Sequence, residues 1–235
     1  MSDQNLLISV KRNEEYKYLS VTSMISVTFL ICAMVFTYRI IEFGPFLTPG
    51  GVIPFAATYL VAALITEVYG YKHARKIIFG NFVCIFIFNI TVSFLLKLPT
   101  PSGINYSAYN QIFNSALYVM IIYSIGFFFG DYINAFCIAK WRNFLKGKYF
   151  FIRLIGASII GQCSFSIIVI PALYLHTLSP NRLIQQFCTT ILAKLLVILI
   201  LSFPFSVIAK LLMRYENIDS ESPKVIFNPF TMNQT

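Results

Sequence analysis

The chain of 235 residues is 57% hydrophobic and only 11% charged, with a mean hydropathy of +0.74 and a net charge of +9. This composition excludes an ordinary soluble globular domain and indicates an integral membrane protein. The basic residues lie almost entirely in short connections between apolar segments, so the positive charge indicates membrane topology rather than nucleic-acid binding.

Six apolar segments are long enough to cross a bilayer, whose hydrocarbon core of about 30 Å requires roughly 20 helical residues. The first segment has no small-residue cleavage site, so we expect a retained span. The sequence predicts an all-α, six-helix transmembrane bundle over residues 19–213, between a cytoplasmic segment (1–18) and a disordered cytoplasmic tail (214–235). The expected spans are 19–41, 52–69, 77–97, 113–138, 154–176 and 187–213.

The distribution of Lys and Arg predicts the orientation of the bundle. With both termini inside, the inner segments hold 14 of these residues, whereas the outer segments hold only Arg39, Lys97 and Arg182. Short cytoplasmic loops of membrane proteins carry the excess of basic residues. We therefore expect both termini in the cytoplasm of a multi-pass protein, with Lys194 left inside the sixth span.

No motif in the sequence predicts an enzyme, a metal site or a bound cofactor. The five cysteines fall in different apolar segments, without a CxxC pair or a nearby histidine, so we expect them to pack as small apolar residues. There is no HExxH, GxSxG or Walker sequence. We therefore expect a protein that is not an enzyme, holds no cofactor and contacts lipid but no nucleic acid.

Polar side chains within the spans are the candidates for function, because such groups are costly in hydrocarbon and usually face the bundle interior. Asp131 and Lys194 both approach the midplane, and we expect them to form an ion pair. Glu67 lies about one turn inside the second span. Two roles are open for it: a group that couples transport to an ion, and an ordinary acid at the membrane boundary. For the amides, the alternative is a hydrogen bond that only holds two helices together. The candidate binding or coupling residues are Glu67, Asn89, Asp131, Asn134, Gln162 and Lys194.

Small residues four positions apart predict close helix packing in the fourth and fifth spans. Gly126 and Gly130 form a GxxxG pattern, and Ala157 and Gly161 repeat this spacing. Such patterns allow two helix backbones to approach each other. We expect these residues to pack the two spans together.

Three strings carry a family resemblance: ITEVYGYKHARKIIFGNF (65–82), GDYINAFCIAKWR (130–142) and RLIGASIIGQ (153–162). In order and spacing they resemble the queuosine precursor transporters, small vitamin-uptake-like membrane carriers, and the similarity runs from about Gly51 to the sixth span. The resemblance implies a six-span importer in the bacterial inner membrane. Its substrate would be a 7-deazaguanine-type base or queuine, used to salvage queuosine in tRNA.

The chain departs from this family pattern at three positions. Ala63, Tyr118 and Phe165 stand where the family usually has an acid, an arginine and an aspartate. Losing these charges changes the hydrogen bonds that a site can offer. A preference for another precursor, such as a free base over a charged one, and a loss of the family's activity both remain open.

Two other functions also remain open from the sequence. One is a substrate-capture membrane subunit that needs a separate ATPase, because this chain has no nucleotide-binding sequence. The other is a structural or assembly protein that transports nothing. A homodimer and an energising partner are equally open.

Overall fold

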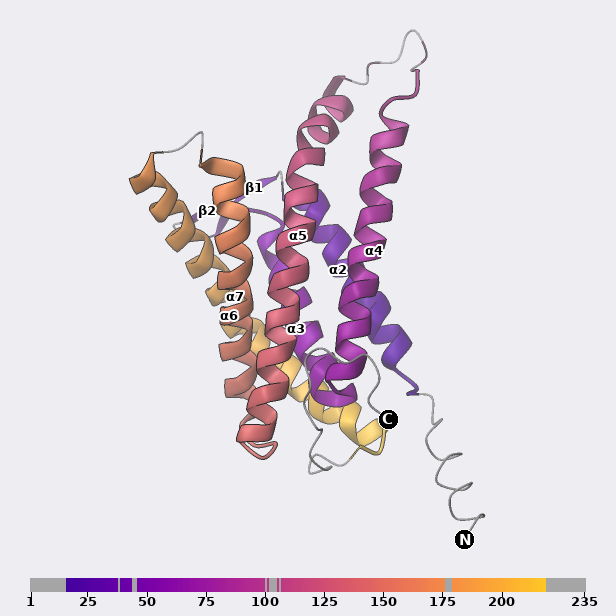
Figure 1. Cartoon of the computed structure of the whole chain (residues 1–235), viewed down its shortest axis with the longest axis vertical. Helices are drawn as coiled ribbons and strands as arrows, with labels where there is room; N and C mark the ends of the chain where they lie inside the picture. Colours follow the sequence, from indigo (N-terminus) through magenta and orange to yellow (C-terminus); the bar gives the residue numbers. More distant parts are fainter. Residues whose placement is uncertain are drawn as a thin grey trace.

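The computed structural model describes residues 16–37, 39–43, 46–99, 101, 105, 107–175 and 179–218. In this part of the chain, six helices are long and apolar enough to cross a membrane, which confirms the all-α six-span bundle (Figure 1). A short antiparallel hairpin lies between the first two helices. The elements are α2 (Leu19–Phe36), β1 (Ile40–Phe43), β2 (Phe46–Pro49), α3 (Val52–Tyr69), α4 (Tyr71–Leu95), α5 (Ser107–Phe144), α6 (Phe150–Tyr174) and α7 (Pro180–Tyr215).

The second and third spans meet without a loop. α3 ends at Tyr69, α4 begins at Tyr71, and Gly70 makes the corner with a φ of +83° that glycine adopts easily. The helix therefore begins six residues before the apolar segment expected to span the membrane. The basic cluster 72–76 is helical, because Lys and Arg are good helix formers and a hydropathy pattern marks only the apolar part of a helix.

The other helix ends also differ from the apolar segments. α2 is shorter than expected, because residues from Ile40 onward pair in the hairpin, with Ile40 opposite Pro49. α5 continues to Phe144, and α7 begins earlier than expected at Pro180, where proline suits the first helical position. These polar extensions carry helices beyond the hydrocarbon core.

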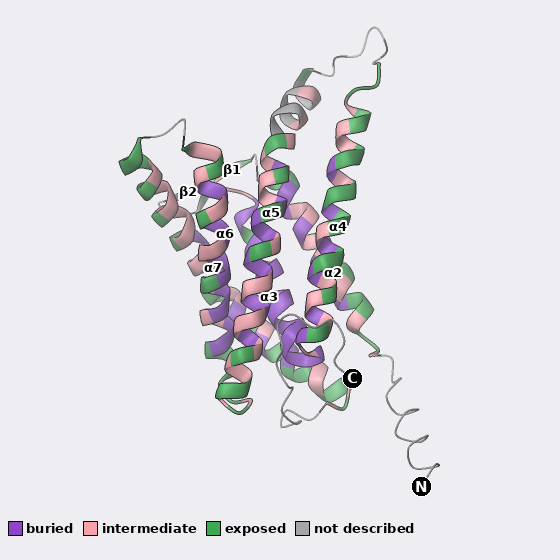
Figure 2. Ribbon diagram, viewed as in Figure 1, coloured by how far each residue is buried: buried purple, intermediate pink, exposed green. Residues whose placement is uncertain are grey.

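α3 is the central helix of the bundle. Of the residues in its span, 89% are buried, against at most 50% in each of the other five spans. Figure 2 shows its purple ribbon surrounded by the others. α3 packs against every other helix, and its alanines leave room for their side chains. Any site in the interior must therefore include residues of α3.

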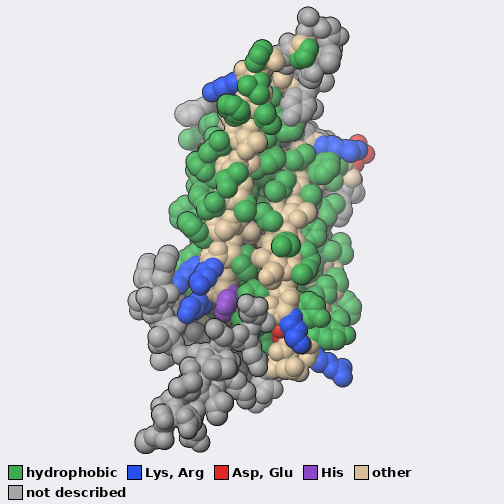
Figure 3. All heavy atoms as spheres, turned by 90° about the vertical axis from the view of Figure 1, so that its right-hand side faces the viewer, with side chains coloured by type: hydrophobic (Ala, Val, Ile, Leu, Met, Phe, Trp, Pro, Cys, Tyr) green, Lys and Arg blue, Asp and Glu red, His purple; other side chains and the backbone are tan. Residues whose placement is uncertain are grey.

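The outer surface of the helices is largely apolar. Figure 3 shows hydrophobic side chains over the middle of one face and Lys and Arg gathered mainly towards one end. Large exposed side chains such as Met24, Phe79 and Phe94 belong to this surface. A lipid environment explains these exposed apolar groups, which water would disfavour.

The first and last helices are joined at the basic end of the bundle. Glu216, just after α7, accepts hydrogen bonds from the backbone N–H groups of Lys17 (3.1 Å) and Tyr18 (2.8 Å), and from the Tyr69 hydroxyl (3.2 Å). The carboxylate thus satisfies free N–H groups at the start of α2. The first residues of the predicted disordered tail are ordered here, and the rest of it, from residue 219, lies outside the described residues, as do residues 1–15.

The predicted packing of small residues is confirmed between α5 and α6. A Cβ on Gly161 would lie 2.7 Å from the Gly130 carbonyl oxygen and 2.8 Å from Cε1 of Tyr59. A Cβ on Gly130 would meet the Tyr59 hydroxyl. The two glycines therefore let α5, α6 and the Tyr59 ring of α3 meet at one point.

We expect Gly161→Ala to lower the free energy of unfolding by about 1–3 kcal/mol, because the methyl group collides with backbone that cannot easily move. Gly80→Ala is the matched control in α4, since nothing lies within 4 Å of the place that its new methyl group would occupy. The control should be neutral or stabilising, by up to about 1 kcal/mol. Thermal unfolding of the purified variants in detergent measures both, and equal effects would contradict the proposed packing.

Candidate functional site

Glu67 lies in the last turns of α3 and forms a buried ion pair with Arg153 of α6. Its two carboxylate oxygens accept hydrogen bonds from Nη1 (2.7 Å) and Nη2 (2.8 Å) of the guanidinium. The side chains are 4% and 0% exposed, respectively. Among the described residues this is the only ion pair within 4.0 Å, and it has the two-pronged geometry of the strongest Arg–carboxylate contacts.

Further hydrogen bonds hold this pair in place. Arg153 donates from Nε to the Lys148 carbonyl (3.0 Å) and from Nη2 to the Gly147 carbonyl (3.2 Å). Arg142 of α5 donates to the backbone carbonyl of Glu67 at 2.6 Å, which satisfies a free carbonyl at the end of α3. The contacts join α3, α5 and α6, and they favour a structural role for Glu67 over a coupling role.

Asp131 and Asn134 lie on α5, fully buried against the centre of the bundle. Asn134 donates from Nδ2 to the backbone carbonyl of Tyr59 at 2.8 Å, which links α5 to α3. Neither carboxylate oxygen of Asp131 has a hydrogen-bond partner in the described part of the chain, and neither has the buried Tyr59 hydroxyl. Asp131 is therefore a buried acid without a cation beside it, the kind of group that points to function within a membrane.

The expected ion pair between Asp131 and Lys194 is not formed, so this prediction is wrong. The Lys194 ammonium lies instead over two aromatic rings, 4.1 Å from the Phe165 centroid and 5.0 Å from the Phe55 centroid. Asp131 lies 13 residues before the end of α5 and Lys194 lies 14 residues after the start of α7, about 20 Å along each helix. These distances are measured from opposite ends of the two helices, so each residue lies several ångströms from the middle of its own helix and on the opposite side of it from the other.

Asn89 belongs to a helix–helix contact. Its Nδ2 donates to Ser124 Oγ of α5 at 3.2 Å, and Asn81 makes a similar bond to Ser26 Oγ of α2 at 2.9 Å. Both pairs join α4 to a neighbouring helix. For Asn89 the structure therefore favours the alternative of an interhelical hydrogen bond.

Gln162 is part of a polar stripe on α6. Ser158, Gln162 and Ser166 are spaced by four residues, are at most 2% exposed, and have no side-chain hydrogen-bond partner among the described residues. They cover about 12 Å of the helix. Sequence reasoning found Gln162 and missed the two serines, although their spacing places all three on one face.

A pocket opens at the end of the bundle away from the basic cluster, between the ends of α2 and α6 and the starts of α3 and α7. Its cavity volume in this conformation is about 30 Å³. Aromatic rings of Phe55, Tyr123 and Phe165 form one part of the wall, and Ser166 and Lys194 are polar groups in it. The pocket therefore meets the polar stripe at Ser166.

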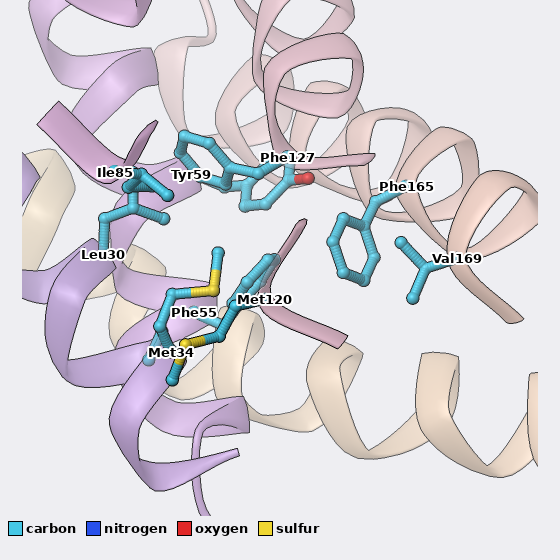
Figure 4. Close-up of a cluster of buried hydrophobic side chains, with 10 residues drawn as sticks. Leu30, Met34, Phe55, Tyr59, Ile85, Met120, Phe127, Phe165 and Val169 are labelled. Carbon is cyan, nitrogen blue, oxygen red and sulfur yellow. The ribbon is translucent and has the colours of Figure 1, made fainter. Parts of the chain in front are cut away.

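The aromatic part of the wall is a packed cluster. The Phe165 ring centroid lies 4.6 Å from that of Phe55 and 5.3 Å from that of Tyr123, at angles typical of tilted or edge-to-face rings. Figure 4 shows Phe165 and Val169 of α6 in the apolar cluster that also contains Tyr59 and Phe127. The cation of Lys194 thus lies over a cluster of packed aromatic rings.

The three positions that depart from the resembled family lie in different surroundings. Ala63 is fully buried among apolar side chains. Tyr118 is 62% exposed on the outer face of α5, and its hydroxyl donates to the Ala172 carbonyl at 3.1 Å. Of the three, only Phe165 lines the pocket, where it lies under Lys194.

A family model described as "Putative vitamin uptake transporter" matches residues 49–209. No curated protein and no solved structure matches. The matched region runs from the end of β2 into α7 and contains the polar stripe, Asp131 and the described pocket lining apart from Thr37. Because the match covers more than half of the sequence, the chain belongs to this vitamin uptake transporter family of membrane proteins.

Proposed function

We propose that the protein imports a queuosine precursor, a 7-deazaguanine-type base or queuine, across the inner membrane of a bacterium for salvage of queuosine in tRNA. Membership of a transporter family supports the transport function. The strings at 65–82, 130–142 and 153–162, which resemble queuosine precursor transporters, support the substrate.

The observation that carries this proposal is the chemistry of the pocket. A flat base needs an apolar or aromatic surface for its ring and a few polar groups for its edge. Phe55, Phe165 and Tyr123 offer aromatic surface, while Ser166 and Lys194 offer groups that form hydrogen bonds. In this conformation the cavity volume is about 30 Å³, so a base enters the pocket only when the surrounding helices move apart.

The polar stripe supports a route from the pocket into the bundle. Ser166 belongs to the pocket, and Gln162 and Ser158 follow it along α6 towards the basic end. These buried side chains have no hydrogen-bond partner among the described residues, so a polar ligand moving past them would meet available donors and acceptors. In another conformation of the helices, the stripe would line the path of the base.

Asp131 supports an ion-coupled carrier rather than a capture subunit that depends on an ATPase. A coupling carboxylate must gain and lose a proton or another cation during transport. Asp131 can do so without breaking an ion pair, whereas Glu67 is already held by Arg153. We therefore assign the coupling role to Asp131 and the structural role to Glu67.

The proposal predicts that deleting the gene in a host unable to make the precursor removes queuosine from tRNA. Supplied precursor should restore it only when the wild-type protein, or the control variant Cys84→Ala, is expressed. Cys84 is exposed on α4 and outside the pocket. Mass spectrometry of digested tRNA measures the nucleoside. Unchanged queuosine after deletion would show that this substrate is wrong.

A further inference from the structure

Lys194 is the one charged side chain in the pocket lining that the structure describes. It is 4% exposed, and its ammonium has no hydrogen-bond acceptor among the described residues. The rings of Phe165 and Phe55 lie beneath it at 4.1 and 5.0 Å. The cation–π contacts stabilise the positive charge in place, but they do not neutralise it.

No acidic residue of the described chain lines this pocket. The nearby hairpin carries Arg39 and Glu42, and both are exposed and outside the lining. Asp131 is also outside it. The local field in the pocket is therefore that of one buried cation, with no opposite charge in the wall.

We propose that the pocket selects planar ligands by their charge: it binds a neutral or anionic base and rejects the same base when that base carries a cationic substituent. This inference rests on the proposed function and narrows its substrate. The Lys194 ammonium donates a hydrogen bond to an acceptor on the edge of the base, such as a ring carbonyl, while the ring contacts the aromatic wall.

The physical reason is that charges interact strongly in a buried site. A second cation about 6 Å from the ammonium would be repelled enough, at the effective dielectric constant of protein sites, to weaken binding at least about tenfold. An acceptor atom on a neutral ligand would instead provide the hydrogen-bond partner that the ammonium lacks. Lys194 alone therefore accounts for the discrimination between neutral and cationic bases.

The test is binding to the purified full-length protein in nanodiscs, measured by calorimetry at pH 6. One probe is 7-deazaguanine with a neutral nitrile at position 7, and a second is the same base with a protonated aminomethyl group there. A third is a planar heteroaromatic carboxylate unrelated to deazaguanine. The variants are Lys194→Met and Phe165→Asp, which places a carboxylate under the ammonium. Lys210→Met, exposed on the same helix, is the matched control.

We expect the wild type and Lys210→Met to bind the neutral base at least about tenfold more tightly than the cationic one. Each pocket variant should lose most of this difference in affinity. Lys194→Met lacks the cation, and Phe165→Asp neutralises it with a carboxylate. Melting temperatures show whether each variant is folded. If only one of the two pocket variants folds, that variant alone is sufficient for the test.

Three results separate this inference from the proposed function. Equal or tighter binding of the cationic base to the wild type overturns the charge selection but leaves a queuosine precursor as the substrate. If the wild type binds only the carboxylate, and Lys194→Met does not bind it, the charge selection is supported and a deazaguanine is excluded as the substrate. Binding of none of the three probes overturns both.

Discussion

Arg153→Met is expected to destabilise the protein by about 3–5 kcal/mol, because it leaves the Glu67 carboxylate buried without a counter-ion. The same change also removes the hydrogen bonds from Arg153 to the Lys148 and Gly147 carbonyls. Glu67→Gln should have a comparable effect, since it leaves the guanidinium unpaired. Unfolding of the purified variants in detergent, with the amount of protein in the membrane as a second readout, measures the loss.

The double variant Glu67→Gln/Arg153→Met is the decisive comparison. It removes both charges together, so we expect it to be more stable than the sum of the two single effects predicts. Lys148→Met is the control, because that side chain is exposed and lies in the same connection between α5 and α6. It should change stability by less than about 0.5 kcal/mol. Additive single effects would show that the pair is not an energetic unit.

The sequence predicted the architecture well for a physical reason. A helix that crosses a bilayer needs about 20 apolar residues, and such segments are visible in the sequence alone. The helix ends were less predictable, because polar residues such as those at 72–76 continue α4 outside the apolar segment. The single-residue corner at Gly70 follows from its positive φ, which a hydropathy pattern does not report.

The site was predicted only in part, because depth and sign of charge do not specify the direction of a side chain. Arg153 was counted with the cytoplasmic basic residues, although it folds inward and is completely buried against Glu67. Lys194 faces Phe165 and Phe55 rather than Asp131. These contacts depend on how the helices are rotated about their axes, and that rotation is set by tertiary packing.

A single periodic signal would have extended the candidate site. Ser158 and Ser166 flank Gln162 at a spacing of four residues, which places the three on one helix face whatever the rotation of α6. Serines are common in transmembrane helices as packing residues, so neither one stands out alone. Their position beside a buried glutamine, leading from the pocket wall, gives them a role in the proposed path.

Asp131→Asn is expected to leave folding and ligand binding near the wild-type level but to abolish accumulation of ligand against its gradient. Asparagine has nearly the same shape as aspartate, and no cation in the described chain loses a partner when the charge is removed. A carrier without its coupling group should still exchange ligand across the membrane, while an ion gradient no longer drives net uptake. The loss of concentrative uptake should exceed about tenfold.

Proteoliposomes that contain only the purified protein distinguish ion coupling from ligand binding and movement. Uptake driven by an imposed pH gradient measures coupling, and exchange of labelled for unlabelled ligand measures binding and movement without it. Asn89→Ala is the matched control, because it removes a buried hydrogen bond between α4 and α5 and should cost about 1 kcal/mol of stability without affecting coupling. Full concentrative uptake by Asp131→Asn would exclude Asp131 as the coupling group. If Asp131→Asn lowers only the amount of protein, Asp131 has a structural role. If the purified wild-type protein takes up no ligand in the absence of an ATPase, the protein is a capture subunit.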